Sequence, residues 1–292
     1  MRESGHDDEI WVFAGSNDGD LTSRQAAATL FAKVQPTHVL HLAAKVGGLY
    51  ANANDNVGFW RQNMAIQDNI NTLCQETEVI KLVSCLSTCV FPDKVTYPIE
   101  EEFLHQGPPH PSNEGYAYAK RMVDVQNRLY RAQFGCHFTS VVPTNVYGKY
   151  DNFSLQGGHV IPCLIHKCHI AQLTNSDFVV LGSGRPLRQF IYSKDLARLM
   201  IWALKEYDDP TPIIFSDTEE MSIAQVARMI AIAFDFKGKI IFDDTKSDGQ
   251  LRKTVSNSKL MTHLPSFEFT PMSDALSETI QWFSQNFDVA RK

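Results

Sequence analysis

The sequence lacks the marks of several protein classes. No apolar run in its 292 residues is long enough to span a bilayer, and residues 1–9 are polar where a secretory signal would need an apolar stretch. None of the six cysteines belongs to a Cys-x-x-Cys pair, so neither a zinc site nor a disulfide framework is predicted. No internal repeat or low-complexity tract is present. These absences predict a cytoplasmic protein with reduced thiols, no membrane contact and no metal site.

An excess of basic charge is also missing. The chain has 27 lysines and arginines against 33 acidic residues, a formal net charge of −6 at pH 7. A surface of that sign repels nucleic acid and anionic membranes, so neither is predicted as a partner. The apolar content of 43% is ordinary for a globular protein, and the length suffices for one large α/β domain or two smaller ones.

What the chain does contain is an alternation of short apolar runs and helical patterns. Strands are predicted at 10–14, 38–44, 81–86 and 137–142, and helices at 21–34, 56–76 and 116–134. The first of these helices is expected to have Thr22 or Ser23 as its N-cap. This alternation predicts a parallel, doubly wound sheet with helices on both faces, in which ligands bind beyond the carboxyl ends of the strands. Further strands are predicted at 178–181, 212–216 and 239–242, and further helices at 158–169, 196–207 and from near 222 and 273.

The predicted helix at 116–134 carries the most informative spacing. Tyr116 and Lys120 are four residues apart and therefore share one face of the helix. An ammonium there is expected to lower the pKa of the phenol, which makes Tyr116 a proton donor or acceptor near neutral pH. The same helix is expected to bury an apolar stripe and to stop at Gly135. The stripe consists of Met122, Val125, Leu129 and Ala132.

By itself a Tyr-x-x-x-Lys spacing is weak, but its context is specific. Ser87 follows a predicted strand, and Asn145 ends the Pro-Thr-Asn that follows another. With Tyr116 and Lys120 they resemble the extended short-chain dehydrogenase/reductase superfamily, whose catalytic triad is Ser or Thr, Tyr and Lys. Five further motifs resemble the GDP-L-fucose synthase family within the nucleotide-sugar branch. They are LSTCVFP (86–92), PTNVYG (143–148), DNF (151–153), GHVIP (158–162) and KSDGQ (246–250).

The resemblance implies a reaction in two stages: epimerisation of GDP-4-keto-6-deoxy-D-mannose at C3 and C5, then NADPH-dependent reduction of the C4 ketone to GDP-L-fucose. Ser87 and Tyr116 would donate hydrogen bonds to the enolate oxygen. Cys89 and His159 would take and return the protons on carbon. Tyr116 would then protonate the C4 alkoxide, with Lys120 holding the phenol and the nicotinamide ribose.

The resemblance also implies the ligand contacts and the division of the chain. NADP(H) contacts fall on Asp20, Leu21, Ala43, Lys120, Pro143, Thr144, Asn145, Val146 and His159. GDP-sugar contacts fall on Lys167, Leu181, Arg188 and Asp248, with Leu181 replacing a tryptophan of some relatives. Residues 1–148 would form the NADP-binding Rossmann-like domain, and 149–292 a smaller mixed substrate lobe with some chain returning to the first domain. Helices 56–76 and 116–134 would pair in a homodimer.

Residue types alone leave purely structural roles open for several of these side chains. Cys89 can be a small buried apolar residue, and His159 a helix-start histidine satisfied by the backbone. Arg188 can belong to a structural ion pair, and Lys167 can be a solvated lysine, the usual fate of that residue.

The sequence departs from the superfamily at the pyrophosphate site. The superfamily begins with a strand, a Gly-x-x-Gly-x-x-Gly turn and a helix that receives the pyrophosphate, and no such segment is present. The absent strand would lie inside the sheet, so two neighbours should have unpaired edges. We expect a shortened form of an ordinary enzyme. Alternatives are a variant with a rearranged start, a non-catalytic dimer partner, and a related nucleotide-sugar epimerase or dehydratase.

Overall fold

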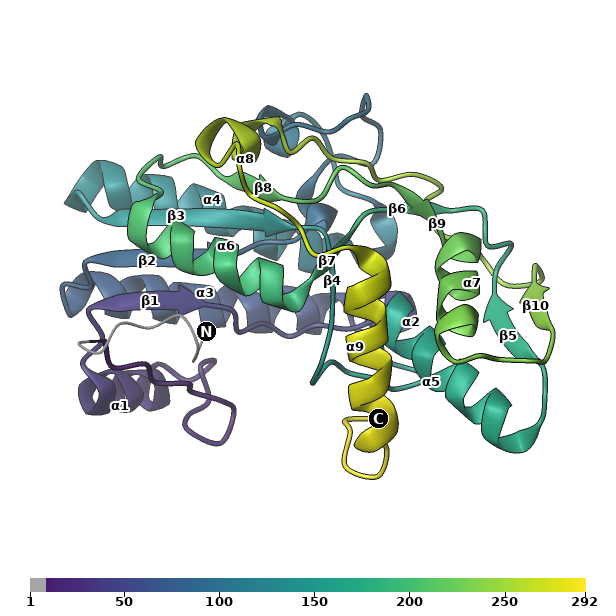
Figure 1. Ribbon diagram of the computed structural model, residues 1–292. Coiled ribbons are helices and arrows are strands. Elements are labelled where there is room, and N and C mark those ends of the chain that lie inside the picture. Colours follow the sequence, from purple (N-terminus) through teal and green to yellow (C-terminus); the bar gives the residue numbers. More distant parts are fainter. Residues whose placement is uncertain (1–8) are drawn as a thin grey trace. The chain divides into compact units, whose positions relative to one another are not determined.

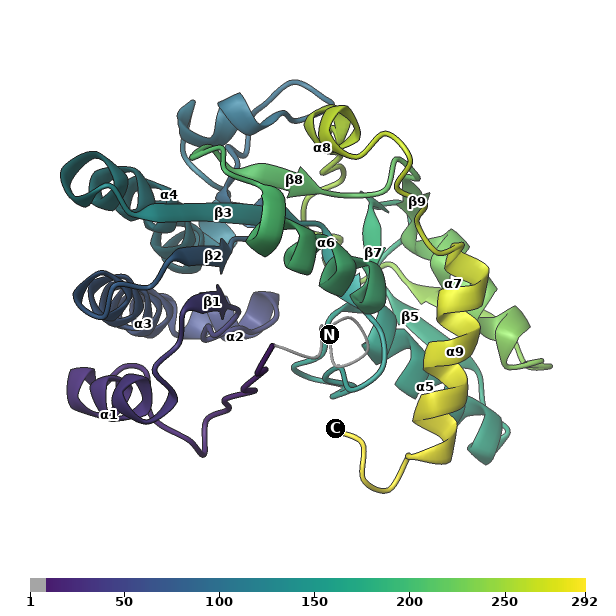
Figure 2. The same cartoon turned by 60° about the vertical axis from the view of Figure 1, so that its left-hand side comes forward.

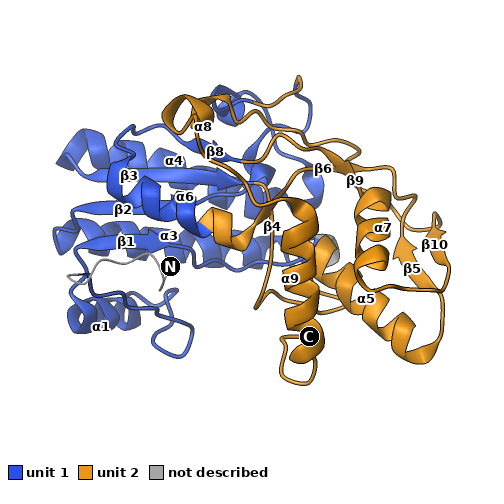
Figure 3. Cartoon of the chain, viewed as in Figure 1, with its two compact units in different colours: residues 1–95, 100–143, 197–215 blue, residues 96–99, 144–196, 216–292 orange. Residues whose placement is uncertain are grey.

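The structure is a computed structural model that describes residues 9–292, except for the side chains at 49, 50 and 53. The polar segment predicted to lack a targeting signal lies almost entirely outside the described residues. The chain divides into two compact units (Figure 3). Unit 1 comprises residues 1–95, 100–143 and 197–215, and unit 2 comprises residues 96–99, 144–196 and 216–292. Among the described residues, no helix is both long enough and apolar enough to cross a membrane.

Unit 1 is built on a parallel four-stranded sheet with the order β1-β2-β3-β8. The strands are β1 (His38–His41), β2 (Lys81–Cys85), β3 (His137–Pro143) and β8 (Ile213–Phe215). In the register, Val83 of β2 lies opposite Leu40 on one side and Thr139 on the other. Leu82 and Val83 are fully buried, as expected for a central strand covered on both faces. The predicted doubly wound parallel sheet is confirmed.

The helices of unit 1 flank this sheet. They are α1 (Arg24–Val34), α2 (Leu49–Asn54), α3 (Asn56–Glu76), α4 (Glu114–Phe134) and residues 197–206 of α6 (Ser193–Glu206). Figures 1 and 2 show α3 and α4 on one face of the sheet and α6 on the other. Short 3₁₀ helices are η1 (Thr88–Val90), η2 (Glu101–His105) and η3 (Pro111–Asn113). The predicted Ser23 cap and the Gly135 stop, at φ +70°, are confirmed.

One predicted strand is wrong. Residues 10–14 form no strand, and Ile10 is 94% exposed. A strand needs a neighbour that accepts and donates its backbone hydrogen bonds, and within residues 9–292 no strand pairs with this segment. Within the same residues β1 pairs with β2 alone, so its other edge is unpaired. The apolar composition of 10–14 is that of a strand, but composition does not supply the partner.

The predicted buried stripe of α4 is also wrong. Leu129 is 61% exposed, and the other members of the stripe are exposed or half-buried. The opposite side of the helix is buried instead, although it carries Lys120, Arg121, Asp124 and Asn127. Helix α4 therefore packs against its own unit through a face of mixed polarity, which also carries Ala117, Ala119 and Val123, and leaves much of its apolar stripe at the surface.

Unit 2 combines three strand pairs with four helices. Parallel pairs join β4 (Asn145–Tyr147) to β7 (Phe190–Tyr192) and β5 (Phe178–Leu181) to β10 (Ile240–Asp243), and β6 (Leu187–Arg188) runs antiparallel to β9 (Met221–Ser222). The helices are α5 (Val160–Thr174), α7 (Ile223–Ala233), α8 (Ser258–His263) and α9 (Met272–Gln285). An apolar core holds α5, α7 and α9 together, and in it the rings of Phe153 and Phe283 stack with centroids 4.3 Å apart.

Candidate active site

Four of the predicted catalytic residues lie together in unit 1. Ser87 follows β2, and Cys89 is the middle residue of η1. Tyr116 and Lys120 lie in the first two turns of α4, which packs against η1. The hydroxyl oxygen of Ser87 accepts the N–H of Cys89 at 3.4 Å, so Ser87 caps the turn that carries the thiol. The strand end, the turn and the helix start thus bring a hydroxyl, a thiol, a phenol and an ammonium into one region.

Lys120 is held by the backbone of β2. Its Nζ donates to the carbonyl oxygen of Cys85 at 2.8 Å, and the side chain is 4% exposed. Burial lowers the pKa of Lys120, and the thiols of Cys85 and Cys89 act in the opposite direction. No carboxylate of the described chain forms an ion pair with this ammonium. Lys120 therefore brings a positive charge to the site that its own unit leaves uncompensated.

The expected effect of Lys120 on Tyr116 is absent. Burial raises the pKa of Tyr116 well above its ordinary value, with smaller contributions in the same direction from Cys89 and Cys85. The prediction of a lowered phenol pKa is wrong here because the ring is buried, packed edge-on against Phe59, and burial disfavours the charged phenolate. Tyr116 is thus a neutral phenol, which is the form that donates a proton.

His41 is a neighbour of Lys120 that sequence reasoning missed. It ends β1, is 5% exposed and has its pKa lowered to about 3, first by burial and then by the charge of Lys120. A hydrogen bond with Gln67 acts in the opposite direction. Gln67 in turn donates to Asn71 at 2.6 Å, and Asn71 donates to Asn127 of α4 at 3.2 Å. A single sequence offers no signal for this buried chain, because its members are spread over residues 41 to 127.

The neutral state of His41 makes stability depend on pH. Its pKa is about 3 in the folded chain and 6.5 ordinarily, so the unfolded chain takes up the proton first as the pH falls. Its contribution is fully present above pH 6.5 and is lost progressively toward pH 3. We expect this group to lower the free energy of unfolding by up to about 1.4 kcal/mol per pH unit below that point. Urea unfolding of the chain and of His41→Gln at several pH values between about 6.5 and 5 measures the slope, which should be shallower in the variant. His38 and His169, whose pKa values burial also lowers, contribute to the slope of both proteins.

The matched control for that experiment is His137→Gln, which changes an exposed histidine of the same unit. It should keep the slope of the parent chain. Equal slopes in the parent chain and in His41→Gln would contradict the buried, neutral state of His41.

The remaining predicted catalytic residue lies in unit 2. His159 is the N-cap residue of α5, and its exposed side chain makes no capping hydrogen bond. It lies near Asp151, a half-buried carboxyl whose pKa is raised, mainly by burial. The alternative in which His159 is satisfied by the helix backbone is therefore not what the structure shows, and the ring is available to a ligand.

The predicted substrate residues gather near the carboxyl ends of β5 and β10. Asp248 accepts the backbone N–H of Ser183 at 2.7 Å and its hydroxyl at 2.6 Å. These bonds, followed by Arg185 and Arg188, lower the pKa of Asp248. Arg188 donates to the carbonyls of Leu187 at 2.7 Å and Gln250 at 2.6 Å, so it is a backbone-bound guanidinium rather than one of a close ion pair.

The other two predicted substrate residues occupy less constrained positions. Leu181, the last residue of β5, is 48% exposed. Lys167 is half-buried on α5, and its charge helps to lower the pKa of Asp243, after the hydrogen bonds of Thr245. Unit 2 therefore presents two cations, an exposed apolar side chain and an anchored carboxylate around these strand ends.

The predicted cofactor residues divide into two groups. Near the nicotinamide end, Pro143 ends β3, and the hydroxyl of Thr144 is buried without a hydrogen-bond partner in the described chain. Asn145 donates to the carbonyl of Gln189 at 2.8 Å, and Val146 follows it in β4. In unit 2, the buried Thr144 hydroxyl without a partner fits a polar ligand, because such a group is costly. In unit 1, the Lys120 ammonium fits one as well, since no carboxylate of the described chain pairs with it.

The adenine side has fewer contacts of this kind. Asp20 is exposed and accepts the N–H and the hydroxyl of Thr22, at 2.9 and 2.7 Å, and half-buried Leu21 follows it. Ala43 is exposed just beyond β1. Within residues 9–292 the turn between β1 and α2 contains Gly47 and Gly48, but no Gly-x-x-Gly-x-x-Gly turn leads a strand into a helix, so the described chain fits NADP(H) at the nicotinamide end and lacks that motif for the pyrophosphate.

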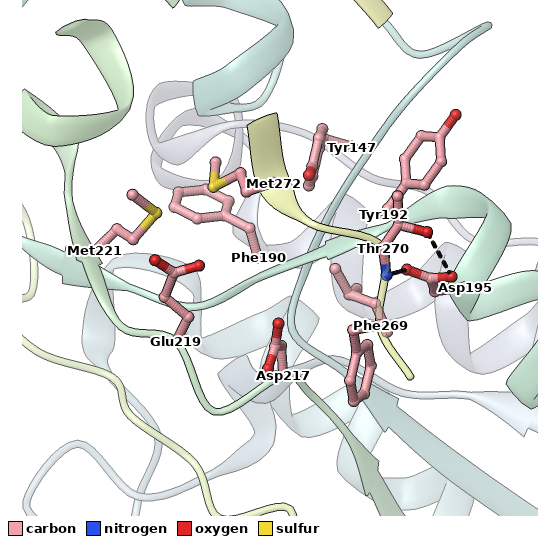
Figure 4. A pocket seen from close by; sticks show the side chains of 11 residues that line it. Tyr147, Phe190, Tyr192, Asp195, Asp217, Glu219, Met221, Phe269, Thr270 and Met272 are labelled. Atoms are coloured by element: carbon pink, nitrogen blue, oxygen red, sulfur yellow. Dashed lines mark hydrogen bonds between the residues drawn. The ribbon is translucent and has the colours of Figure 1, made fainter. Parts of the chain in front are cut away.

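A small pocket lies apart from these residues in unit 2 (Figure 4). Aromatic rings and carboxylates line it, and Asp195 accepts hydrogen bonds from the N–H and hydroxyl of Thr270 at 2.8 and 3.0 Å. None of the predicted site residues is among its lining. It is therefore not the candidate active site.

Known proteins similar to this chain show the family to which it belongs. The model of the NAD dependent epimerase/dehydratase family matches residues 3–216. The GDP-L-fucose synthase of Dictyostelium discoideum is 54% identical over 100% of this chain and 92% of its own length. The probable GDP-L-fucose synthase of Drosophila melanogaster is 48% identical, covering 100% of this chain and 94% of its own.

Solved structures give the same result. The crystal structure of a GDP-L-fucose synthetase from Naegleria fowleri bound to NADP has a TM-score of 0.92 and 52% identity, covering 97% of this chain and 86% of that one. The chain has a Tyr-x-x-x-Lys helix beside a Ser-x-Cys turn, on a parallel sheet. Together with its relatives and the matching family model, these features make the chain a member of the GDP-L-fucose synthase family, within the extended short-chain dehydrogenases/reductases.

Proposed function

We propose that this chain epimerises GDP-4-keto-6-deoxy-D-mannose at C3 and C5 and then reduces C4 to give GDP-L-fucose. The observation that carries the proposal is the cluster of Ser87, Cys89, Tyr116 and Lys120 in unit 1 of a chain that belongs to this family. Each of the four groups has a separate task in the chemistry.

In the epimerisation, the ketone makes its neighbours C3 and C5 acidic. Removal of either proton puts negative charge on the C4 oxygen, where the hydroxyl of Ser87 and the neutral phenol of Tyr116 donate hydrogen bonds. Cys89 and His159 exchange the protons with the carbons from opposite sides. The neutrality of Tyr116 supports this assignment, because a phenolate could not donate to the enolate oxygen.

In the reduction, NADPH when bound supplies the hydride to C4. Tyr116 donates its proton to the oxygen that becomes the C4 hydroxyl. Lys120 keeps a positive charge next to this transfer and contacts the nicotinamide ribose. Thr144 uses its orphaned hydroxyl on the cofactor, and the other predicted cofactor residues contact it through backbone and side-chain groups. These are Asp20, Leu21, Ala43, Pro143, Asn145, Val146 and His159.

The GDP end of the substrate is proposed to bind in unit 2. Lys167 and Arg188 neutralise the diphosphate, and Leu181 offers apolar surface. Asp248 has a firm position from which to contact the substrate because two hydrogen bonds to Ser183 hold it. In this division of roles residues 1–148 bind NADP(H), and residues 149–292 bind the GDP-sugar, with some chain returning to the first domain.

The experiment that tests the function uses the purified chain with NADPH and the keto-sugar nucleotide. Expected results are oxidation of NADPH, formation of GDP-L-fucose, and incorporation of deuterium at C3 and C5 in D₂O. A folded chain that has no affinity for NADPH and does not turn over would contradict the proposal and favour a non-catalytic dimer partner.

We also propose that the chain is a cytoplasmic homodimer that pairs through α3 and α4. The free state of all six cysteines supports a reducing compartment. The exposed stripe of Met122, Val125, Leu129 and Ala132 supports pairing through α4, because a row of apolar side chains at the surface marks an interface.

A charge in that stripe should break the dimer. We expect Leu129→Glu to weaken self-association by about 30-fold or more, since it removes an apolar contact and buries a carboxylate. Sedimentation equilibrium measures the change. The control is Leu173→Glu, which changes a leucine of α5 that is 67% exposed. A parent chain that is monomeric, or equal effects of the two substitutions, would contradict this interface.

A further inference from the structure

A second buried cation lies next to Lys120 and is bound to the turn that carries Cys89. Arg121 is 5% exposed, and its Nε and Nη2 donate to the carbonyl of Val90 at 2.9 and 2.5 Å. Its Nη1 donates to the carbonyl of Gly107 at 2.8 Å. Val90 ends η1 and directly follows Cys89. One guanidinium thus joins η1, the loop at Gly107 and α4, which carries Tyr116.

The charge of Arg121 is uncompensated in the same way as that of Lys120. Buried arginines usually pair with carboxylates, yet within residues 9–292 none forms an ion pair with Arg121. The ring of Tyr118 lies 5.2 Å from its Cζ, and Cys89 interacts electrostatically with it. Burial is the main influence on its pKa, which it lowers.

Among the groups around Lys120 and Arg121, Cys89 is the one that interacts with both cations. Lys120 faces the neutral His41 from β1, Cys85 from β2 and Cys89 from η1. Arg121 faces Cys89 and Tyr118. Two adjacent buried positive charges without a carboxylate favour an anion beside them, and a thiol is the group among these that becomes an anion most readily.

We propose that Arg121 is a positioning residue of the epimerisation, which fixes the turn of Cys89 against α4 and stabilises the Cys89 thiolate. The inference rests on the proposed function. The thiolate takes the proton from the carbon next to the ketone, the electron pair of that C–H bond moves into the enolate, and the negative charge passes from sulfur to the C4 oxygen. No oxidant or reductant takes part in this step.

Two substitutions separate position from charge. Arg121→Met removes both the charge and the hydrogen bonds. Arg121→Lys keeps the charge, but its ammonium is a compact donor that does not bridge the carbonyls of Val90 and Gly107. The matched control is Arg128→Gln on the same helix, whose side chain is 51% exposed.

The first readout does not depend on substrate. The ultraviolet absorbance of the thiolate is titrated with pH, as the difference between each protein and its Cys89→Ser derivative. We expect the midpoint to move to higher pH by about one unit or more in Arg121→Met and to move little in Arg121→Lys and Arg128→Gln. An unchanged midpoint in Arg121→Met overturns the electrostatic role of Arg121.

The second readout separates the two stages of the reaction. We expect Arg121→Met to slow deuterium exchange at C3 and C5 by about 10- to 100-fold, and Arg121→Lys to slow it by a smaller factor. Reduction of a substrate that is already epimerised should change by less than about threefold. If Arg121→Met does not fold, the exchange rate of Arg121→Lys tests the proposal instead. An Arg121→Lys rate equal to that of the parent chain overturns the positioning role.

Failure of the proposed function has a different signature. One such result is a parent chain that exchanges no deuterium although the titration of Cys89 depends on Arg121. That result would contradict the epimerase assignment, and the effect of Arg121 on the Cys89 thiolate would stand. Normal exchange that is insensitive to both Arg121 substitutions would keep the epimerase and overturn the role of Arg121.

Discussion

Replacement of Tyr116 by phenylalanine is expected to lower the rate of C4 reduction by about 10²- to 10⁴-fold, which is the usual contribution of a general acid. Tyr116 is a neutral phenol because burial raises its pKa, so it holds the proton that the C4 oxygen needs when hydride arrives. Phenylalanine keeps the edge-on packing against Phe59 and removes only the hydroxyl. Single-turnover oxidation of NADPH measures the loss.

The matched control for this substitution is Tyr130→Phe. Tyr130 lies on the same helix, about four turns farther along, and its hydroxyl is 2.9 Å from that of Thr72. This substitution should leave the rate of C4 reduction within about twofold of the parent. It should lower the free energy of unfolding by less than about 1 kcal/mol, the usual net contribution of one hydrogen bond. Binding of NADPH to Tyr116→Phe should be preserved. If Tyr116→Phe reduces the ketone at the rate of the control, another group is the proton donor.

Replacement of Cys89 by serine is expected to lower deuterium exchange at C3 and C5 by about 10²- to 10⁴-fold. Serine has nearly the shape of cysteine, but its hydroxyl does not ionise near neutral pH, so it cannot take a proton from carbon. The hydroxyl of Ser87 already caps the turn, which should therefore keep its conformation. Nuclear magnetic resonance of the sugar protons in D₂O measures exchange at each carbon separately.

Two further proteins complete that experiment. Cys136→Ser changes a half-buried cysteine of the same unit and should exchange at the parent rate. Reduction of an already epimerised substrate should survive in Cys89→Ser, because that step needs Tyr116 and Lys120 instead. A Cys89→Ala variant that keeps full epimerisation would contradict the assignment and favour a related nucleotide-sugar epimerase or dehydratase.

The elements and residues that the sequence predicted well are those with local causes. Helix α3 has the predicted bounds, and α1 begins after its predicted Ser23 cap. Helix α4 ends at Gly135 because a glycine adopts the left-handed conformation without strain. A cap, a stop and a helical repeat each involve residues a few positions apart, so a single sequence contains them.

The candidate site was found from the sequence in a different way. Tyr116 and Lys120 have helical spacing and Ser87 follows a strand end, but this pattern is weak by itself, and the resemblance to a known family gave these positions and Cys89 their expected roles. The elements missed are short ones. Strands β4 and β7 have three residues each, and β6 and β9 have two each, so none is long enough to show a strand pattern.

What only the tertiary structure decided is the environment of those residues. Residues 10–14 have a strand's composition but no pairing neighbour among the described residues, and α4 buries a face of mixed polarity instead of its apolar stripe. The sequence by itself determined the helices, the strand ends and the catalytic residue types. The fold decided that Tyr116 is a neutral acid and that Arg121 holds the turn of Cys89, because burial and hydrogen bonds between distant residues arise only when the chain has folded.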